Sequence, residues 1–409
     1  MTNGQRVIVL GAGPAGLVSA NILQDAGIDC VVLERSSREH VRTRARAGYL
    51  APNTVRILER HGLAEGLRRR GRTHGVCEFR TETTRFRLEY EGLGSREPHT
   101  VYPQQDLVAD LLTRYVERGG RIVFGVEAQA VLGADGSRPA VLAHDPDGAP
   151  VTWSARYIAG CDGRHGAARR SAPPGAVRRH RMDHGVSWLG LLAEAPPSLD
   201  AVGYAVHARG FAGHMARSAD ATRYYLQCER GAEPDAWSEE DIWQELSVRL
   251  GADRFGPLRR GPIVQRAVVD LESDVLEPLR YGSLLLAGDA ASLISPSAAK
   301  GANLAVLEAE LLAEAVIADL VHGDPEPLDR YSHRCLEHIW RAQEFSGWMV
   351  RLLHGTGGTG VLDNTIGFDN TDGFDDAAGF DNALRHSRLE SLRTSRSHQD
   401  WFAENYVGV

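Results

Sequence analysis

Lysine is almost absent from this chain of 409 residues. Of its 46 basic residues only Lys300 is a lysine, and the others are arginine. A genome-wide preference for GC-rich codons accounts for this bias, but it does not explain why a lysine is kept at position 300. Because 54 acidic residues give a net charge of -8, the composition argues against a protein that coats nucleic acid.

Paired cysteines and long apolar runs are also missing. The five cysteines are far apart and form no CxxC pair, which argues against a disulfide scaffold and a zinc site. No apolar run approaches the roughly 18 residues needed to cross a bilayer, and residues 1–6 lack the pattern of a signal peptide. We therefore expect a soluble cytoplasmic protein with no metal, membrane or nucleic-acid partner. Its length predicts two or more cooperating domains.

The first 34 residues carry a strand–turn–helix–strand pattern. Strands are expected at Arg6–Leu10 and Cys30–Glu34, with a helix at Leu17–Ala26 between them. Glycines in the turn let the backbone approach a pyrophosphate at the helix N-terminus, and an acidic residue that ends the second strand binds a ribose. We therefore assign nucleotide binding to Gly11, Gly13, Ala15, Gly16 and Glu34.

Two glycine–aspartate motifs indicate which nucleotide is bound. Asp162-Gly163, followed by Arg169, resembles the DG motif of flavin monooxygenases, and Gly288-Asp289 resembles their GD motif. Asp289 would hold the ribityl chain of FAD, and the following helix would favour an anionic reduced flavin at its N-terminus. Both motifs follow buried strands, so one nucleotide-binding layer takes strands from both ends of the chain. The strand-rich segment 187–227 is then an inserted substrate domain.

Further segments resemble the 4-hydroxybenzoate 3-monooxygenase (p-hydroxybenzoate hydroxylase) family of class A FAD-dependent aromatic hydroxylases. The resemblance runs nearly end to end. It is carried by Arg44–Gly48, Ile158–Gly163, Trp188–Leu192, Arg209–Ala212, Ala299–Gly301 and Glu404–Gly408.

The resemblance implies an α/β fold with three parts. A Rossmann-like FAD-binding domain of the glutathione-reductase type would comprise residues 1–75, 101–180 and 275–345. An inserted substrate domain built on a mixed β-sheet would comprise residues 76–100 and 181–274. A helical C-terminal region, residues 346–409, would hold the interface of a homodimer.

The resemblance also implies a reaction. In the family, NAD(P)H reduces FAD, O2 is captured as a flavin C4a-hydroperoxide, and one oxygen atom is transferred to an electron-rich phenol. Tyr204, Tyr406 and His74 match the family's relay for the phenol proton, and all three can donate and accept hydrogen bonds. Pro296, whose carbonyl would face the phenol oxygen, is kept. Lys300 would add positive potential near the reduced flavin. Its ammonium is compact, whereas a guanidinium is wide and planar, so an arginine is not expected to replace it.

The substrate implied is an aromatic carboxylate. Arg217 matches the family's carboxylate-binding arginine, Tyr225 matches its tyrosine partner, and Trp188 is expected beside them. Met215 stands where the family usually has serine and cannot donate a hydrogen bond. Ser292, Ser295 and Ala298 also depart from the family, and Ser295 is expected in the substrate site. We therefore expect a ring-substituted 4-hydroxybenzoate, such as a 3-amino derivative, hydroxylated beside its hydroxyl or its carboxylate.

Other positions match the family's cofactor contacts. For FAD these are Arg35, Arg44, Arg46, Gln104, Asp162, Asp289, Gly301 and Asn303, and for NAD(P)H they are Arg38, Arg42 and His165. Glu272 stands where the family usually has a cofactor-binding arginine, and a carboxylate repels a phosphate. The arginine cluster favours NADPH, with NADH left open.

Alternatives to hydroxylation stay open. An oxidative decarboxylating hydroxylase would attack the carbon that bears the carboxylate, and a flavin-binding regulator would not turn over. A flavin-dependent halogenase shares the fold, but the chain has no W-x-W-x-I-P segment and no second lysine.

A Gly-Phe-Asp motif recurs three times between residues 367 and 382. Its spacing does not match an EF-hand calcium loop. We expect a flexible acidic insertion there.

Overall fold

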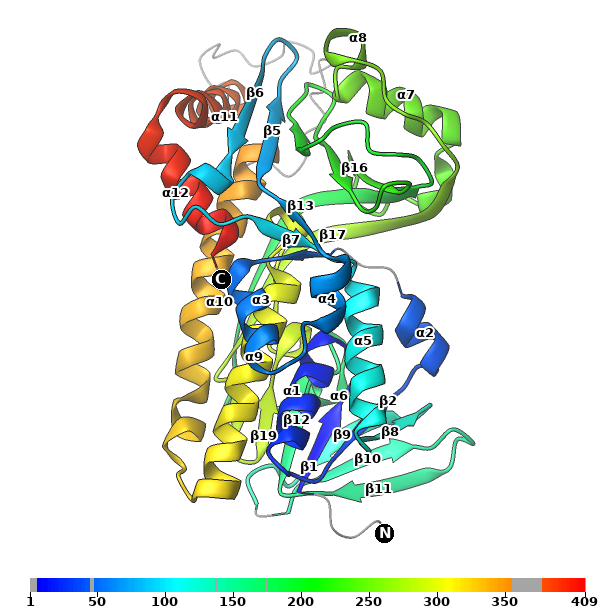
Figure 1. Cartoon of the computed structure of the whole chain (residues 1–409), viewed down its shortest axis with the longest axis vertical. Coiled ribbons are helices and arrows are strands. Elements are labelled where there is room, and N and C mark those ends of the chain that lie inside the picture. The colour runs from blue at the N-terminus through cyan, green and yellow to red at the C-terminus, as the bar shows by residue number, and fades with distance from the viewer. Residues whose placement is uncertain (1–5, 45–47, 137, 174, 355–376, 409) are drawn as a thin grey trace, which may run out of the picture.

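The computed structural model describes residues 6–44, 48–136, 138–173, 175–354 and 377–408. One sheet forms the centre of a lower body and another the centre of an upper body, and a long helix runs beside both (Figure 1).

The lower body is built on a six-stranded sheet in the order β18-β19-β12-β1-β2-β8. Its inner strands are continuous apolar runs, as strands buried on both faces require. Strand β12, from the middle of the chain, pairs parallel with β1, and β19, from the late chain, pairs parallel with β12, so one layer takes strands from both ends of the chain, as the sequence predicts. The strands are β1 (Val7–Leu10), β2 (Cys30–Glu34), β8 (Arg121–Phe124), β12 (Tyr157–Gly160), β18 (Arg280–Tyr281) and β19 (Leu284–Leu286).

Helices and a second sheet cover this layer. Helix α1 (Pro14–Asp25) packs between α5 (Gln104–Glu117) and α9 (Gly301–Ile317). A three-stranded sheet contributes Val131, Val141 and Trp153 to the same core. Its strands are β9 (Glu127–Leu132), β10 (Ala140–His144) and β11 (Pro150–Ser154).

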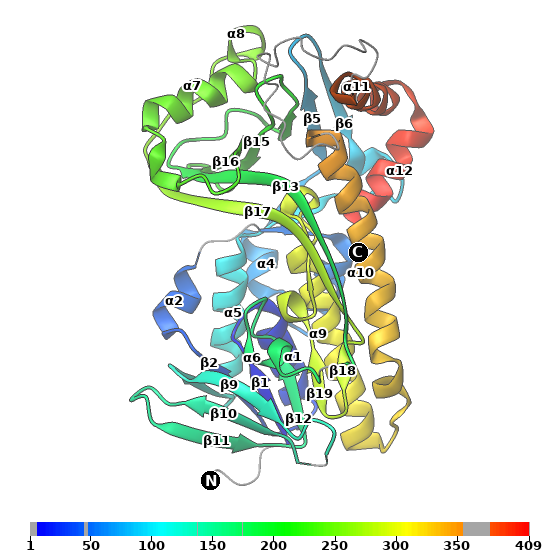
Figure 2. The same cartoon turned by 180° about the vertical axis from the view of Figure 1, so that it is seen from behind.

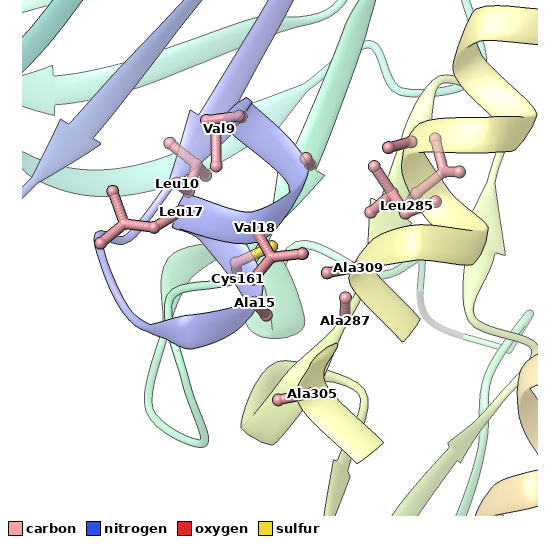
Figure 3. Close-up of a cluster of buried hydrophobic side chains, with 14 of the residues drawn as sticks. Val9, Leu10, Ala15, Leu17, Val18, Cys161, Leu285, Ala287, Ala305 and Ala309 are labelled. Atoms are coloured by element: carbon pink, nitrogen blue, oxygen red, sulfur yellow. The ribbon is translucent and has the colours of Figure 1, made fainter. Parts of the chain in front are cut away.

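Small side chains bring α1 and α9 close together. Figure 3 shows Ala15 of α1 near Ala305 and Ala309 of α9, with Ala287 beside them. Ser19 Oγ donates a hydrogen bond to the carbonyl oxygen of Ala309 at 3.3 Å. The helix after the first glycine motif and the helix after the GD motif therefore pack directly against each other.

The upper body is built on an eight-stranded sheet in the order β20-β17-β13-β16-β15-β14-β5-β6. Strand β14 is parallel to β5, whereas the other pairs are antiparallel, so the sheet is mixed, as expected. Strands β13 and β17 pair over most of their length and cross from the upper to the lower body (Figure 2). The strands are β5 (Val76–Arg80), β6 (Arg85–Glu89), β13 (Arg178–Ala193), β14 (Val202–Ala205), β15 (Ala212–Ala216), β16 (Thr222–Cys228), β17 (Ile263–Glu277) and β20 (Ser292–Leu293).

The C-terminal helices complete the α/β fold that the sequence predicts. Helix α10 (Glu326–His354) runs along both bodies, and α11 (Ala377–Thr394) and α12 (Arg396–Val407) pack beside its upper end (Figure 1). No helix formed by the described residues is long and apolar enough to cross a membrane.

Shorter elements fill the remaining positions. The helices are α2 (Arg38–Thr43), α3 (Pro52–Arg60), α4 (Glu65–Arg70), α6 (Ala167–Arg170), α7 (Glu239–Arg249) and α8 (Ala252–Phe255). A small sheet has the order β3-β7-β4, with β3 (Tyr49–Leu50), β4 (Arg72–His74) and β7 (His99–Val101). Single helical turns lie at Tyr90–Gly92, Pro234–Ala236, Gly288–Ala290, Pro296–Ala298 and Ala318–His322.

The Gly-Phe-Asp repeat departs from the expectation of a flexible insertion. Its first two units lie outside the described residues, but the third, Gly379–Asn382, belongs to helix α11. A helix in this segment presents Phe380 to solvent, with 65% of its surface exposed. Propensity did not reveal this helix because glycine and aspartate disfavour helix interiors.

Candidate functional site

The turn between β1 and α1 leaves an open cradle at Gly13. A Cβ on Gly11, whose φ is +93°, would lie 2.5 Å from the carbonyl oxygen of Cys161, and one on Gly16 would lie 2.0 Å from that of Gly11. A Cβ on Gly13 would meet no atom of the described residues within 4 Å. Gly11 and Gly16 therefore let the turn close, while Gly13 caps α1 and faces free space that suits a pyrophosphate.

Glu34 joins the ends of two strands. Its Oε2 accepts a hydrogen bond from the Ala12 backbone at 2.7 Å, and its Oε1 accepts one from Ser36 at 2.7 Å. The carboxylate is buried beside the turn. Because each carboxylate oxygen has more than one lone pair, Glu34 can still accept a ribose hydroxyl.

The arginines after Glu34 are exposed. Arg35 lines a cavity of about 510 Å³ together with Ser36, Gly125 and His144. Of the remaining arginines predicted to bind cofactor, Arg38, Arg42 and Arg44 are exposed along and just after α2, and Arg46 lies outside the described residues.

The DG motif holds a free acceptor. Asp162 follows β12, and its Oδ2 accepts a hydrogen bond from the Ala168 backbone at 3.0 Å. Its Oδ1 is buried and has no hydrogen-bond partner among the described residues. Burial raises the pKa of this carboxyl. A ligand hydroxyl or a bound water would satisfy this oxygen.

The GD motif is held by a buried acid that the sequence analysis missed. Asp289 is half-buried in the turn Gly288–Ala290. Glu308 of α9 accepts a hydrogen bond from the Gly288 backbone at 2.6 Å, and burial raises the pKa of Glu308 to about 8. Glu308 therefore fixes the turn that carries Asp289.

Three further cofactor predictions lie at helix starts. Gln104 begins α5, and Gly301 begins α9. Asn303 joins α9 to β3 and α3: its Oδ1 accepts from the Ala51 backbone at 2.8 Å and from Thr54 Oγ1 at 2.7 Å, and its Nδ2 donates to two carbonyls. The Asn303 amide is thus fully used within the protein.

These features fit a flavin dinucleotide. The space in front of Gly13 suits the pyrophosphate, the cavity beside Arg35 suits the adenosine, and the unpartnered Oδ1 of Asp162 suits a hydroxyl. The N-terminus of α9 lies next to the GD motif and favours negative charge.

The two predicted relay tyrosines meet. Tyr204 of β14 and Tyr406 of α12 place their hydroxyl oxygens 2.8 Å apart. Both side chains are buried, and burial raises both pKa values well above the ordinary value of tyrosine. The pair is therefore neutral and linked, as a proton relay requires.

His74 lies farther along this chain of groups. Its Nδ1 is 3.4 Å from the Tyr90 hydroxyl, which also donates to the His74 carbonyl and lies 3.1 Å from Nδ1 of His99. The rings of Tyr90 and His99 each form a T-shaped contact with the Tyr406 ring, with centroid distances of 5.1 and 5.0 Å. Tyr90 and His99 therefore stand between His74 and Tyr406, and sequence reasoning missed both.

The predicted carboxylate site lies on β15 and β16. Arg217 follows β15 and donates to Gln105 Oε1 of α5 at 2.5 Å. Burial and the neighbouring Arg223 lower the pKa of Arg217 to about 10. Arg217, Arg223 and Met215 line one cavity with Tyr49. The structure thus adds Gln105 and Arg223 to the predicted residues.

Trp188 forms a hydrogen bond with a histidine that was not predicted from the sequence. Trp188 Nε1 donates to Nε2 of His354 at 3.0 Å, and Nδ1 of His354 donates to Gln227 Oε1 at 2.8 Å. The Trp188 ring lies 5.0 Å from that of Tyr225. His354 therefore fixes an aromatic wall beside the predicted carboxylate site.

The loop before α9 carries Ser295, Pro296 and Lys300. Ser295 is buried, and its carbonyl accepts a hydrogen bond from Ser346 at 3.1 Å, whereas Pro296 is exposed. The Pro296 carbonyl closes a turn with the Ala299 backbone at 3.2 Å. This anchors the loop to α10 and leaves the Pro296 ring accessible.

Lys300 binds the end of the chain. Its ammonium donates to the carbonyls of Asn405, at 2.6 Å, of Tyr406, at 2.9 Å, and of Gly408. It also lies over the Phe345 ring at 5.5 Å. Burial lowers the pKa of Lys300 to about 7, and the three carbonyl oxygens favour its charged form.

Glu272 is neutralised by arginines. It is buried and accepts hydrogen bonds from Arg164 at 2.6 Å and from Arg181 at 2.8 Å. Arg181 holds the pKa of Glu272 below its ordinary value. His165, next to Arg164, is exposed. The Glu272 carboxylate therefore positions two arginines, and its negative charge is compensated by them.

Among the missed residues, Arg223 had a usable signal. Arg223 is two residues before Tyr225 on a strand, so both face the same side. Tyr90, His99 and His354 come from distant segments, and no spacing in the sequence joins them to Tyr406 or Trp188.

The comparisons with known proteins agree with these features. A model of the FAD binding domain matches residues 5–346. The chain is 34% identical to p-hydroxybenzoate hydroxylase of Acinetobacter baylyi, over 99% of this chain and 95% of that protein. It is 29% identical to a 3-amino-4-hydroxybenzoate 2-monooxygenase of Streptomyces platensis, over 83% of this chain and 86% of the other.

Solved structures share the fold. p-Nitrophenol 4-monooxygenase of Pseudomonas putida is 19% identical, with a TM-score of 0.78 over 99% of this chain and 98% of the other. Aklavinone-11 hydroxylase, solved with FAD and aklavinone, is 20% identical, with a TM-score of 0.72 over 90% of this chain and 72% of the other.

The match to the FAD binding domain, together with the fit of the cradle, makes FAD the cofactor of this chain. With the near full-length identity to p-hydroxybenzoate hydroxylase, it follows that the chain belongs to the family of FAD-dependent aromatic hydroxylases.

Proposed function

We propose that this enzyme uses NAD(P)H and O2 to hydroxylate a 4-hydroxybenzoate-type aromatic carboxylate with a further ring substituent, 3-amino-4-hydroxybenzoate being one example. The observation that carries the proposal is the contact of 2.8 Å between the hydroxyls of Tyr204 and Tyr406. Tyr204 also packs in one apolar cluster with Trp188, Met215 and Tyr225. A phenol held there has a proton acceptor at one end and an arginine at the other.

The tyrosines would move the phenol proton without ionising. Tyr204 Oη would accept the phenol proton as its own proton passes to Tyr406 Oη, and Tyr406 would release its proton in turn towards His74, past Tyr90 and His99. Neither tyrosine oxygen then keeps a charge. Their raised pKa values favour this exchange over a standing tyrosinate. The resulting phenolate is the more electron-rich ring, and FAD, when bound, supplies the chemistry that activates O2.

Arg217 would hold the carboxylate. A guanidinium offers two parallel donors to a carboxylate, and Gln105 orients it at 2.5 Å. Met215 cannot donate a hydrogen bond to a carboxylate, which favours a substrate that differs from plain 4-hydroxybenzoate.

NADPH is the proposed reductant. The exposed arginines Arg38 and Arg42 attract a phosphate, and the pairing of Glu272 with two arginines removes the repulsion expected from its charge. The rates of NADPH and NADH oxidation at equal concentration test this choice.

The function is tested with the purified FAD-loaded enzyme and a panel of phenolic acids. Substrate-stimulated NAD(P)H oxidation and a product heavier by one oxygen atom are expected. A product that has lost CO2 would identify an oxidative decarboxylating hydroxylase instead, and the absence of stimulation by any phenolic acid would favour a flavin-binding regulator. A clear preference for plain 4-hydroxybenzoate would refute the ring substituent.

A homodimer and a cytoplasmic location are proposed from the family resemblance alone. Light scattering and cell fractionation test them.

A further inference from the structure

Trp188 and Gln227 lie opposite each other on neighbouring strands of the upper sheet. The two residues form a direct pair between β13 and β16, so their side chains lie on the same face of the sheet. His354, the last residue of α10, forms a hydrogen bond with each of them. One imidazole therefore bridges two strands of the sheet that carries Tyr204 and Tyr225.

The hydrogen bonds at His354 select one tautomer of its imidazole. Gln227 Oε1 accepts a hydrogen bond from the Phe211 backbone at 3.0 Å, which identifies this atom as the amide oxygen because a backbone N–H can only donate. Nδ1 of His354, 2.8 Å from the same oxygen, must then carry a proton. Nε2 must be unprotonated, because the indole N–H of Trp188 donates to it at 3.0 Å.

The surroundings of His354 keep this imidazole neutral. The side chain is buried, with 5% of the residue exposed. Burial, together with Arg385 of α11 and His184 of β13, lowers the pKa of His354 to about 3. In an imidazolium, Nε2 would be a donor facing the indole N–H of Trp188. Near neutral pH the ring is therefore an acceptor for Trp188.

The position of the Trp188 ring affects both ends of the predicted substrate site. Its centroid lies 5.0 Å from that of Tyr225, the predicted partner of Arg217. It also stacks on Phe211 at 4.9 Å, and the Phe211 ring lies 6.4 Å from that of Tyr204. Because a packed interior has few voids, a rotation of the indole would displace these neighbouring rings as well.

We propose that His354 is a positioning residue for the hydroxylation: as a neutral imidazole with its proton on Nδ1, it fixes the plane of the Trp188 ring and thereby the spacing between Tyr204 and Tyr225. This inference rests on the proposed function. Both ring nitrogens of His354 are used within the protein, so it acts through Trp188. A displacement of about 1 Å at a positioning residue can slow a reaction about 100-fold, so the effect is expected in catalysis as well as in stability.

Three variants separate the two hydrogen bonds of His354. In His354→Gln, the longer amide places its oxygen near the position of Nε2, where it can still accept from Trp188. In His354→Asn, the shorter amide reaches only the position of Nδ1, so the indole loses its acceptor, and His354→Leu removes both bonds. We expect His354→Asn and His354→Leu to slow product formation by about 10- to 100-fold. His354→Gln should slow it by no more than about threefold.

A double-variant cycle with Trp188→Phe tests whether His354 acts through the indole. Phenylalanine has no N–H, so in that background His354→Asn should change the rate of product formation by no more than about twofold. The same loss in both backgrounds would overturn the proposal. Equal losses in His354→Gln and His354→Asn would also overturn it, because a purely structural role does not depend on which of the two bonds is kept.

His214→Gln and His214→Asn are the matched controls. His214 is another buried histidine of this sheet, and its Nε2 accepts hydrogen bonds from the backbones of Ser198 and Leu199 at 3.1 and 3.3 Å. Tm and FAD content report the fold of each variant. We expect the two His214 variants to form product at similar rates per bound FAD. A difference as large as that between the His354 variants would assign the effect to packing and overturn the proposal.

Binding of 4-hydroxybenzoate to the FAD-loaded variants, measured through the flavin absorbance, separates this proposal from the proposed function. His354→Asn should raise the Kd by about fivefold, the value of one net hydrogen bond, and His354→Gln by no more than about twofold. If no phenolic acid is hydroxylated, the proposed function fails, while the Kd values still decide the role of His354. Equal Kd values for the two variants would then overturn it.

Discussion

The ammonium group of Lys300 donates a hydrogen bond of 2.9 Å to the carbonyl oxygen of Tyr406, the residue whose hydroxyl meets Tyr204. The one lysine of the chain thus holds the turn of α12 that carries half of the tyrosine pair. An ammonium directs three donors to three carbonyls, whereas a guanidinium is planar and wider. This geometry is a physical reason for a lysine in a chain otherwise rich in arginine.

Lys300→Met is expected to lower stability as well as activity. The substitution removes the donor from the buried carbonyl of Tyr406 and from the partly buried carbonyls of Asn405 and Gly408, and an unsatisfied buried group costs about 1–3 kcal/mol. The family resemblance suggested that Lys300 adds positive potential near the reduced flavin, and the contacts now predict a lower Tm of the variant too. Thermal unfolding of the FAD-loaded variant measures this. Lys300→Arg with an unchanged Tm would contradict the reason given for lysine.

Tyr204→Phe and Tyr406→Phe are expected to slow hydroxylation by about 100- to 10,000-fold, the usual contribution of positioned proton transfer. Each removes one hydroxyl from the pair, so the substrate phenol keeps its proton to higher pH. The absorbance of the bound substrate phenolate as a function of pH measures this. Tyr224→Phe is the control, because Tyr224 is a buried tyrosine of the same sheet whose hydroxyl contacts Ser198 at 2.9 Å. Variants at all three positions with the same loss would assign the effect to packing.

Arg217→Met is expected to raise the Kd of an aromatic carboxylate by about 10- to 150-fold, because hydrogen bonds between charged groups contribute about 1.5–3 kcal/mol. Gln105→Ala should have a smaller effect, since it removes only the group that orients Arg217. The corresponding phenol without a carboxylate should bind both variants and the wild type alike. A loss of affinity for that phenol as well would mean that Arg217 supports the cavity and does not bind the acid.

Glu308 is expected to make stability depend on pH. Its folded pKa of about 8 lies above the ordinary value of 4.5, so the folded protein holds a proton that the unfolded chain has released. The stabilisation is complete below pH 4.5 and is lost as the pH rises to about 8. Glu308→Gln, which cannot ionise, should remove this part of the decline.

The difference in Tm between Glu308→Gln and the wild type, measured from pH 5 to 9, checks this prediction. The difference should shift in favour of the variant as the pH rises. If the Tm of the variant and that of the wild type changed in parallel with pH, Glu308 would have the same pKa in the folded and unfolded protein.

Local patterns predicted much of the fold and the cofactor. The glycine turn, Glu34 and the two glycine–aspartate motifs lie within short segments, so their spacing was visible in the sequence, and the lower sheet contains the strands expected around them. The third Gly-Phe-Asp unit was expected in a flexible insertion and is helical. Its composition gave no helical signal, since glycine and aspartate are weak helix formers.

The sequence by itself determined which residue types are present for nucleotide, proton and carboxylate chemistry. Only the tertiary structure decided their neighbours: Lys300 on the carbonyls of α12, Tyr90 and His99 beside Tyr406, and Arg223 beside Arg217. The physical reason is that hydrogen bonds and burial act between groups that are close in space. Residues of β7, of α12 and at the start of α9 come together only when the two sheets and α10 are packed. Periodicity in the sequence reflects local structure and does not indicate such contacts.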